Sequence, residues 1–200
     1  RKRHAATRAG IGESFVDLNR MRVGNLFINQ LADDAANHDA NDSNDTLAVT
    51  MRDMDDTAAG GAKQTFFDNI YNTTGSGGTP NRQALLATGR QFERDASPII
   101  QYSCQQNFAI LFTDGYATKW QGAGVGNTDA VADNTHTPPY SGVAPYSDDK
   151  SNTIADIAMN FYSSLNWAGI NDINGNALNG GKGLVPPGCN DDVPNPRLDC

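Results

Sequence analysis

The spacing of apolar and polar positions along the chain predicts four helices. In each of them, apolar or small residues recur every three or four positions, the period that places side chains on one helix face. The four ranges are 3–19, 62–71, 81–93 and 151–165. The last is the most strongly amphipathic, and either Asn152 or Thr153 precedes it in a position suited to an N-terminal cap.

Three further stretches predict strands. Residues 21–28 are rich in β-forming types, and residues 46–54 alternate apolar with polar positions. Residues 107–112 (NFAILF) form a nearly continuous apolar run, which is typical of a strand buried on both faces. Taken with the helices, this order predicts an α/β fold in which helices cover both faces of a sheet.

Long polar stretches separate these elements. The Asp-rich residues 32–45 are interpreted as a solvated loop between two strands, because they lack the glycine-anchored spacing of an EF-hand calcium loop. Residues 115–150 form a long excursion rich in Gly, Asn, Thr and Pro, which is typical either of a functional surface or of a partly disordered segment. We therefore expect one domain over residues 1–167, followed by a loop-rich extension over residues 168–200.

Composition narrows the classes of function. The formal net charge of −8 repels polyanions, so nucleic acid is not an expected partner. No apolar run approaches the roughly 20 residues that span a bilayer, so we expect no transmembrane segment. The chain has no G-x-S-x-G elbow, and no histidine lies near a candidate nucleophile at a strand end, so we expect no enzyme activity.

The three cysteines leave the disulfide pattern open. Cys189 and Cys200 bracket a tail with few apolar residues, where a disulfide is plausible in an oxidising compartment. Cys104 is then either a small buried residue or the partner of a cysteine outside this chain. Because there is no CxxC motif and the histidines are scattered, a zinc site is not expected.

Two oxygen-bearing side chains are the candidate binding residues. Asp114 follows the apolar run 107–112 directly, and in open α/β sheets ligands bind beyond the carboxyl ends of the strands. Thr79 lies in the glycine-rich turn that leads into the helix before that strand, so we expect its hydroxyl to lie near the Asp114 carboxylate. Hydroxyl and carboxylate oxygens are ligands suited to Mg²⁺. The alternatives are a simple Asp-Gly turn for Asp114 and a helix cap for Thr79.

Three segments carry a family resemblance. In order along the chain, GGTPNRQALLATGRQF, CQQNFAILFTDGY and YSDDKSNTIADIAMNFY closely resemble the von Willebrand factor type A-like domain of the PilC/PilY family, the type IV pilus tip proteins. The resemblance implies a Rossmann-type sheet with a metal-ion-dependent adhesion site. It also implies that Thr79 is the second element of that site and Asp114 the third, holding Mg²⁺ or, in its place, Ca²⁺ or Mn²⁺.

One part of the family pattern is not in its expected place. The DxSxS motif and its strand should precede the helix at 3–19, and the further strands of the fold should follow Cys200. The formal look-alike at 149–153 (DKSNT) follows no strand, so we interpret it as a helix cap. We therefore expect an incomplete sheet, completed either by a longer polypeptide or by another chain.

The resemblance implies an extracellular function. The leading hypothesis is an adhesion and assembly module at the tip of a type IV pilus, contacting minor pilins and a host or abiotic surface ligand. The alternative is a structural filament or scaffold protein whose von Willebrand A-like domain is degenerate and binds no metal. In that case a strand from another chain would complete the sheet.

Overall fold

The computed structural model describes most of the predicted elements. The described residues are 2–28, 50–73, 78–93, 99–102, 105, 107–113, 115, 124–132, 147–162 and 171–175. Asp114, the three cysteines and the loop at 32–45 lie outside the described residues, as does all of the extension except residues 171–175. The predictions about them stay predictions.

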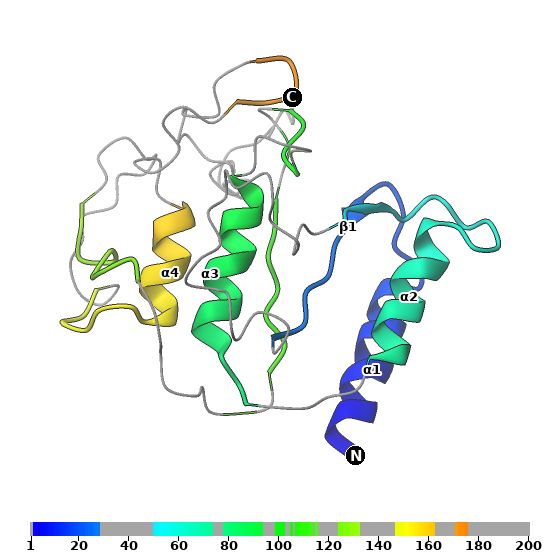
Figure 1. Cartoon of the computed structure of the whole chain (residues 1–200), viewed down its shortest axis with the longest axis horizontal. Coiled ribbons are helices and arrows are strands. Elements are labelled where there is room, and N and C mark those ends of the chain that lie inside the picture. Colours follow the sequence, from blue (N-terminus) through cyan, green and yellow to red (C-terminus); the bar gives the residue numbers. More distant parts are fainter. Residues whose placement is uncertain are drawn as a thin grey trace, which may run out of the picture.

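One half of the molecule consists of two helices and a short hairpin (Figure 1). Helix α1 (Lys2–Phe15) lies beside α2 (Ala62–Asn72), and strand β1 (Arg22–Val23) pairs with β2 (Arg52–Asp53). The pairing is antiparallel, with Arg22 opposite Asp53. These elements confirm the helix predicted at 62–71, whereas the helix predicted at 3–19 ends earlier, at Phe15.

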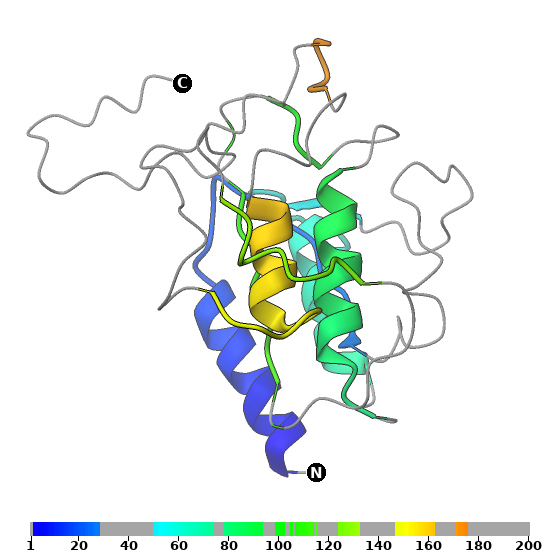
Figure 2. The same cartoon turned by 90° about the vertical axis from the view of Figure 1, so that its left-hand side faces the viewer.

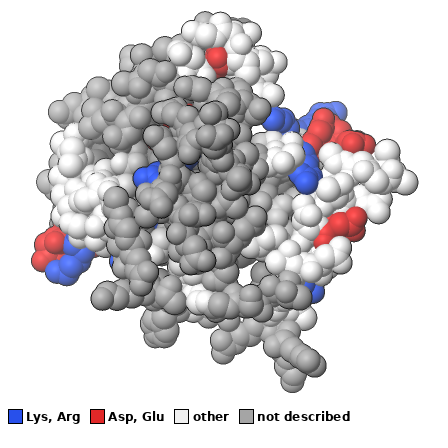
Figure 3. Space-filling model, viewed as in Figure 1, with Lys and Arg blue, Asp and Glu red and all other residues white. Residues whose placement is uncertain are grey.

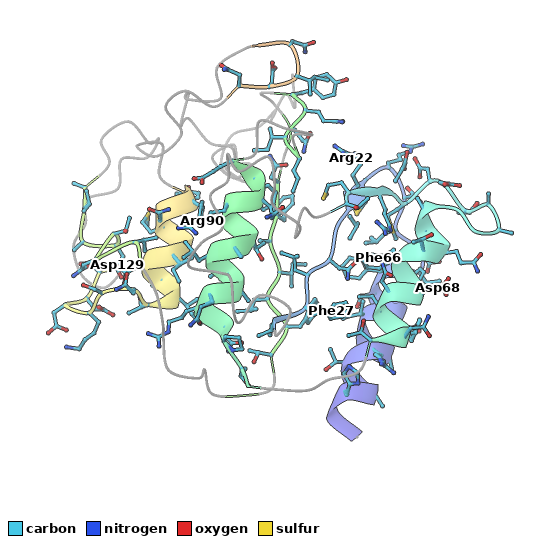
Figure 4. The ribbon with its side chains drawn as sticks, in the orientation of Figure 1. Arg22, Phe27, Phe66, Asp68, Arg90 and Asp129 are labelled. Carbon is cyan, nitrogen blue, oxygen red and sulfur yellow. The ribbon has the colours of Figure 1, made fainter. Side chains whose placement is uncertain are left out.

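An aromatic and aliphatic cluster holds this half together. Met54, Phe66 and Ile70 are buried, and Phe15 and Phe27 pack against them from α1 and from the segment after β1 (Figure 4). The rings of Phe15 and Phe66 stack with their centroids 5.6 Å apart. Each side chain buried in this way contributes about 1.5–3 kcal/mol to the free energy of unfolding. The core of this half therefore consists of the buried face of α2 together with Met54.

The other half contains α3 (Asn81–Phe92) and α4 (Ile154–Tyr162). Figures 1 and 2 show the two helices side by side, with their N-termini at the same end. At their contact, a Cβ atom at Gly89 would overlap the ring of Phe161, so only glycine permits this close approach.

Helix α3 differs from its prediction in how it is buried. The spacing of residues 81–93 predicts one buried face that contains Ala84, Leu85, Thr88 and Phe92. In the structure, Leu85, Thr88 and Phe92 are only partly buried. Instead, Gln83, Leu86 and Gln91 are buried, in addition to Ala84, which the prediction included. The difference arises because α3 is covered from more than one side, and periodicity alone does not reveal a helix that lies inside the molecule.

An extended segment joins the two halves. After β1, Leu26 and Ile28 pack against Ala84 and Ala87 of α3. The Arg22 guanidinium also donates a hydrogen bond of 3.3 Å from Nη1 to the carbonyl oxygen of Ile99. In Figure 1, residues 24–28 and 107–113 both run between the two pairs of helices.

The prediction of a buried strand at 107–112 is wrong in one respect. Residues 107–113 are extended, but they form no strand pairing with any described residue, and Phe108, Ile110 and Phe112 are 73%, 66% and 48% exposed. An apolar run is buried only where a neighbouring strand and a covering layer are present. Among the described residues, β1 and β2 form the sheet, and neither pairs with this run.

The charged side chains lie mainly at the rim of the face seen in Figure 3. They gather over the half that contains α1, α2 and the hairpin, and over the loop that precedes α4. In the part of the chain that the structure describes, no helix has the length and apolar character needed to cross a membrane.

Candidate functional site at the N-termini of α3 and α4

The turn that carries Thr79 leads into the N-terminal end of α3, the end that contacts Gly115. Pro80 is the N-cap of α3, and Thr79 is the residue before it. The backbone N–H of Asn81 donates to the carbonyl oxygen of Thr79 at 2.9 Å, which closes the turn. In Figure 1, the segment 107–113 runs toward this same end of α3.

A side chain of α3 links the threonine turn to the far end of that segment. The Asn81 amide nitrogen Nδ2 lies 3.5 Å from the carbonyl oxygen of Gly115 and donates to it. The residues on both sides of Asp114 are described, and one of them therefore contacts the turn that holds Thr79. Because Asp114 itself lies outside the described residues, its approach to the Thr79 hydroxyl stays a prediction.

Asn81 was not identified from the sequence. Its side chain is 3% exposed, and its Oδ1 oxygen is buried without accepting a hydrogen bond from any described residue. Asparagine is rarely buried to this extent, and a buried amide oxygen without a partner is unfavourable by about 1–3 kcal/mol. The only sequence signal was its place directly after Thr79–Pro80.

The N-cap of α3 is Pro80 and not Thr79. Within the part of the chain that the structure describes, no side chain forms the capping hydrogen bond of this helix, so the predicted cap role of Thr79 is wrong. The reason is positional, because Pro80 occupies the N-cap and moves Thr79 one residue away from it. Gln83 stands at the third helical position, where a capping box would bond to the N-cap N–H, and Pro80 has none.

The first turn of α4 is capped by side chains. The Asp156 carboxylate accepts hydrogen bonds from the backbone N–H of Thr153 at 2.8 Å and from its hydroxyl at 2.9 Å. In return, the Thr153 hydroxyl oxygen accepts the Asp156 backbone N–H at 3.1 Å. This is a capping box, and it confirms the interpretation of the DKSNT stretch as a helix cap. Asp149 of that stretch is exposed and pairs with Lys150 at 2.6 Å.

A second buried carboxyl group lies against this cap. The Asp129 side chain is 2% exposed, and its backbone N–H donates to Asp156 Oδ1 at 3.2 Å (Figure 4 shows Asp129 beside α4). Burial raises the pKa of Asp129, and the negative charges of Asp156 and Asp148 raise it further. The backbone N–H of Asp148 acts in the opposite direction. The neutral form of Asp129 is thereby favoured relative to a free aspartate.

Asp156 is shifted in the other direction. Burial alone would raise its pKa, but hydrogen bonds from the backbone N–H groups of Thr153 and Asp129 and from the Thr153 hydroxyl outweigh burial and lower it. The two neighbouring carboxyl groups therefore have opposite preferences, one for the acid and one for the carboxylate. Sequence reasoning missed the pair because 27 residues separate its members.

Further contacts tie the two N-termini together. The Asn152 amide oxygen accepts the backbone N–H of Gly126 at 2.9 Å, and the Asn152 backbone N–H donates to the Gly126 carbonyl oxygen at 2.9 Å. The Arg82 guanidinium of α3 donates to the Asn152 carbonyl oxygen at 3.5 Å. The open turn of α3 is thus held beside the closed turn of α4.

The described residues contain no cluster of three or more His, Cys, Asp or Glu side chains that could hold a metal ion. The proposed pair of Thr79 and Asp114 is not such a cluster, because one ligand is a hydroxyl group and the other lies outside the described residues.

Comparison with known proteins identifies relatives over half of the chain. The chain is 33% identical over 113 residues to the type IV pilus biogenesis factor PilY1 of Pseudomonas aeruginosa strain PAK, a match that covers 50% of this chain and 10% of the relative. It is 31% identical over 111 residues to PilY1 of strain PAO1, with the same coverage of both chains. In strain UCBPP-PA14 the identity is 31% over 113 residues, covering 51% of this chain and 9% of PilY1.

The matched part of this chain spans about a tenth of the length of these relatives. No family model matches the sequence. No solved structure matches it. The partial similarity to three PilY1 proteins therefore supports the relation of this chain to the PilC/PilY family of type IV pilus proteins.

Proposed function

We propose that this chain is an extracellular adhesion and assembly module of a type IV pilus tip. The observation that carries the proposal is the similarity of half of the chain to type IV pilus biogenesis factors. On this proposal, one part of its surface contacts minor pilins and another binds a ligand on a host or abiotic surface. The net charge of −8 agrees with a partner that is not a nucleic acid.

The ligand site is a divalent-cation site that includes Thr79 and Asp114. The groups present around the threonine turn fit such an ion, because the partly buried Thr79 and the buried amide oxygen of Asn81 offer neutral oxygen donors. We propose Mg²⁺, with Ca²⁺ or Mn²⁺ as alternatives. When bound, the cation would attract a carboxylate of the ligand.

The N-terminus of α3 adds to this preference for an anionic ligand. The aligned peptide dipoles place about half of a positive charge at that end of the helix. This charge opposes a bare cation and favours an ion whose shell is completed by negative groups, such as Asp114 and a ligand carboxylate. The proposal therefore requires the Asp114 charge.

An Asp114→Ala variant of the full-length protein tests the metal site. We expect pilus-dependent attachment and the content of bound divalent metal to fall together, because the substitution removes Asp114, the charged ligand of the proposed site. Asp149→Ala is the matched control, since Asp149 is an exposed aspartate in the DKSNT stretch. Attachment and metal content that stay unchanged in Asp114→Ala would reject the metal site.

The exposed apolar run favours a second candidate function. Phe108, Ile110 and Phe112 are exposed on an extended segment, as expected if a strand from another polypeptide covers them. In this alternative the domain is a metal-free structural or scaffold protein. The mass of the native polypeptide distinguishes the two proposed functions. A 21.4 kDa chain that repeats along a fibre would favour the scaffold, and a far longer polypeptide would favour the tip module.

A further inference from the structure

We infer that Asn81 is an additional oxygen ligand of the cation site, supplying its side-chain amide oxygen beside Thr79. The inference rests on the proposed function, because it deepens the description of the same site. It assigns a role to a buried residue that neither the motif pattern nor the similarity to PilY1 proteins identifies.

The first observation is the state of the amide oxygen. Asn81 is 3% exposed, and within the described residues its Oδ1 accepts no hydrogen bond. Buried acceptors in folded proteins are nearly always satisfied by a donor, by water or by an ion. At the start of a helix next to a candidate cation site, an ion would satisfy this oxygen.

The second observation is the position of the amide group. Its nitrogen donates to the Gly115 carbonyl oxygen at 3.5 Å, and the Asn81 backbone N–H donates to the Thr79 carbonyl oxygen at 2.9 Å. The amide group therefore lies between the threonine turn and the end of the 107–113 segment. Its oxygen is bonded to the same carbon as the nitrogen that makes this contact, so it lies at the same junction.

A comparison with other amides shows that this arrangement is specific. Asn152 also lies at the start of a helix, but its oxygen accepts the Gly126 N–H at 2.9 Å. Gln83 and Asn127 also have a buried oxygen without a described partner. Asn127 lies in the segment 124–132, where its amide nitrogen donates to the Asp148 carbonyl oxygen at 3.0 Å, and Gln83 stands two positions after Asn81. Side chains two residues apart on a helix do not face each other. Asn81 is therefore the amide that serves the Thr79 turn.

The chemistry of the amide oxygen indicates which ion benefits most. Ca²⁺ accepts six to eight oxygen ligands and often includes Asn carbonyls, whereas Mg²⁺ keeps several of its own waters. A neutral oxygen added to a hydroxyl and a carboxylate therefore raises the affinity for Ca²⁺ more than the affinity for Mg²⁺.

The test is calorimetric titration of chelator-treated, full-length protein with Ca²⁺ alone and with Mg²⁺ alone. Asn81→Asp keeps the side-chain shape and adds a charge, so we expect about tenfold tighter Ca²⁺ binding. Asn81→Ala removes the oxygen and should weaken Ca²⁺ binding by about 10–100-fold. Asn19→Asp is the control for added charge, because Asn19 lies in the exposed turn before β1.

The outcomes separate this inference from the proposed function. If Thr79→Ala and Asp114→Ala lose Ca²⁺ while both Asn81 variants bind like the wild type, the inference is overturned and the cation site stands. If the wild type binds neither ion, the cation site fails and the role of Asn81 fails with it. Should circular dichroism show that Asn81→Ala does not fold, Asn81→Asp decides, and unchanged affinity in it rejects the inference.

Discussion

The first turn of α4 is closed by a capping box, whereas the first turn of the neighbouring α3 is not. In α4, the Thr153 hydroxyl and the Asp156 carboxylate bond to each other and to the backbone. In α3, Pro80 takes the cap position without a side-chain bond, and the buried oxygen of Asn81 is left without a described partner. Each helix is preceded by a threonine, so the difference lies in what surrounds that threonine.

This difference bears on helix stability and, under the proposed function, on binding. A capping box stabilises its helix by pairing a hydroxyl and a carboxylate with backbone N–H groups. The first turn of α3 lacks that stabilisation, and on the proposed function its hydroxyl and amide oxygens bind the ion. Proline at the cap position is the cause, since it has no N–H for Gln83 to bond and it displaces Thr79.

Removing the carboxylate that closes α4 should have the largest effect. Asp156 is fully buried and accepts three hydrogen bonds from Thr153 and Asp129. We expect Asp156→Ala to lower the free energy of unfolding by about 3 kcal/mol, because buried donors lose their acceptor. Urea denaturation measures the change.

The exposed Asp68 of α2 offers the matched control for that variant (Figure 4). Asp68→Ala should change stability by less than about 0.5 kcal/mol. A loss below about 1 kcal/mol in Asp156→Ala would contradict the closed cap.

A glycine substitution tests the close packing of α3 against α4. A Cβ atom at Gly89 of α3 would overlap the Phe161 ring of α4, so Gly89→Ala should destabilise the protein by about 1–3 kcal/mol. Gly10 of α1 is the control, since a Cβ there meets no atom within 4 Å. Gly10→Ala should instead stabilise the protein by up to about 1 kcal/mol, through its higher helix propensity. Thermal melting distinguishes the two signs, and equal effects would contradict the close packing of α3 on α4.

The two threonines give the most direct comparison of the turns. Thr153→Ala should cost about 1 kcal/mol, as is usual for the loss of an N-cap hydroxyl. Thr79→Ala should cost less than about 0.5 kcal/mol in metal-free protein, because its hydroxyl caps no helix. Denaturation in the presence of a chelator provides both values. A larger loss for Thr79 than for Thr153 would reverse the comparison.

The smallest expected effect is a dependence of stability on pH. Because the pKa of Asp129 is raised in the folded state, its ionised form is disfavoured there. Its contribution is favourable at low pH and is lost as pH rises from about 3.8 through the raised pKa. Asp129→Asn should therefore be more stable than the wild type at pH 7, and the difference should shrink as pH falls below the raised pKa. A difference that does not vary with pH would exclude this cause.

The pKa of Asp156 is lowered, so Asp156 affects stability at the acidic end of the pH range. Its lowered pKa means that its contribution is present above about 3.8 and is lost as pH falls through the folded-state value. The wild type and Asp129→Asn both contain Asp156, so both lose its stabilising contribution at low pH. The difference in stability between the two proteins therefore still reports on Asp129.

Local patterns in the sequence predicted the parts of the fold that depend on neighbouring residues. The helix at 62–71 and the helix at 81–93 follow from apolar spacing, and the Thr153 cap follows from its place before an apolar run. The burial of Asn81 and the Asp129–Asp156 pair did not follow, because each depends on residues far apart in the chain. The exposure of residues 107–112 was missed for a related reason, since an apolar run does not reveal whether a neighbour covers it.

The exposed side chains of Phe108, Ile110 and Phe112 have a practical consequence for handling the protein. An exposed extended segment with apolar side chains is a site where identical chains associate, and the repulsion from the net charge of −8 opposes that association. High salt screens that repulsion. Purified chain should therefore remain dispersed in dilute, low-salt buffer and scatter more light as salt and concentration rise.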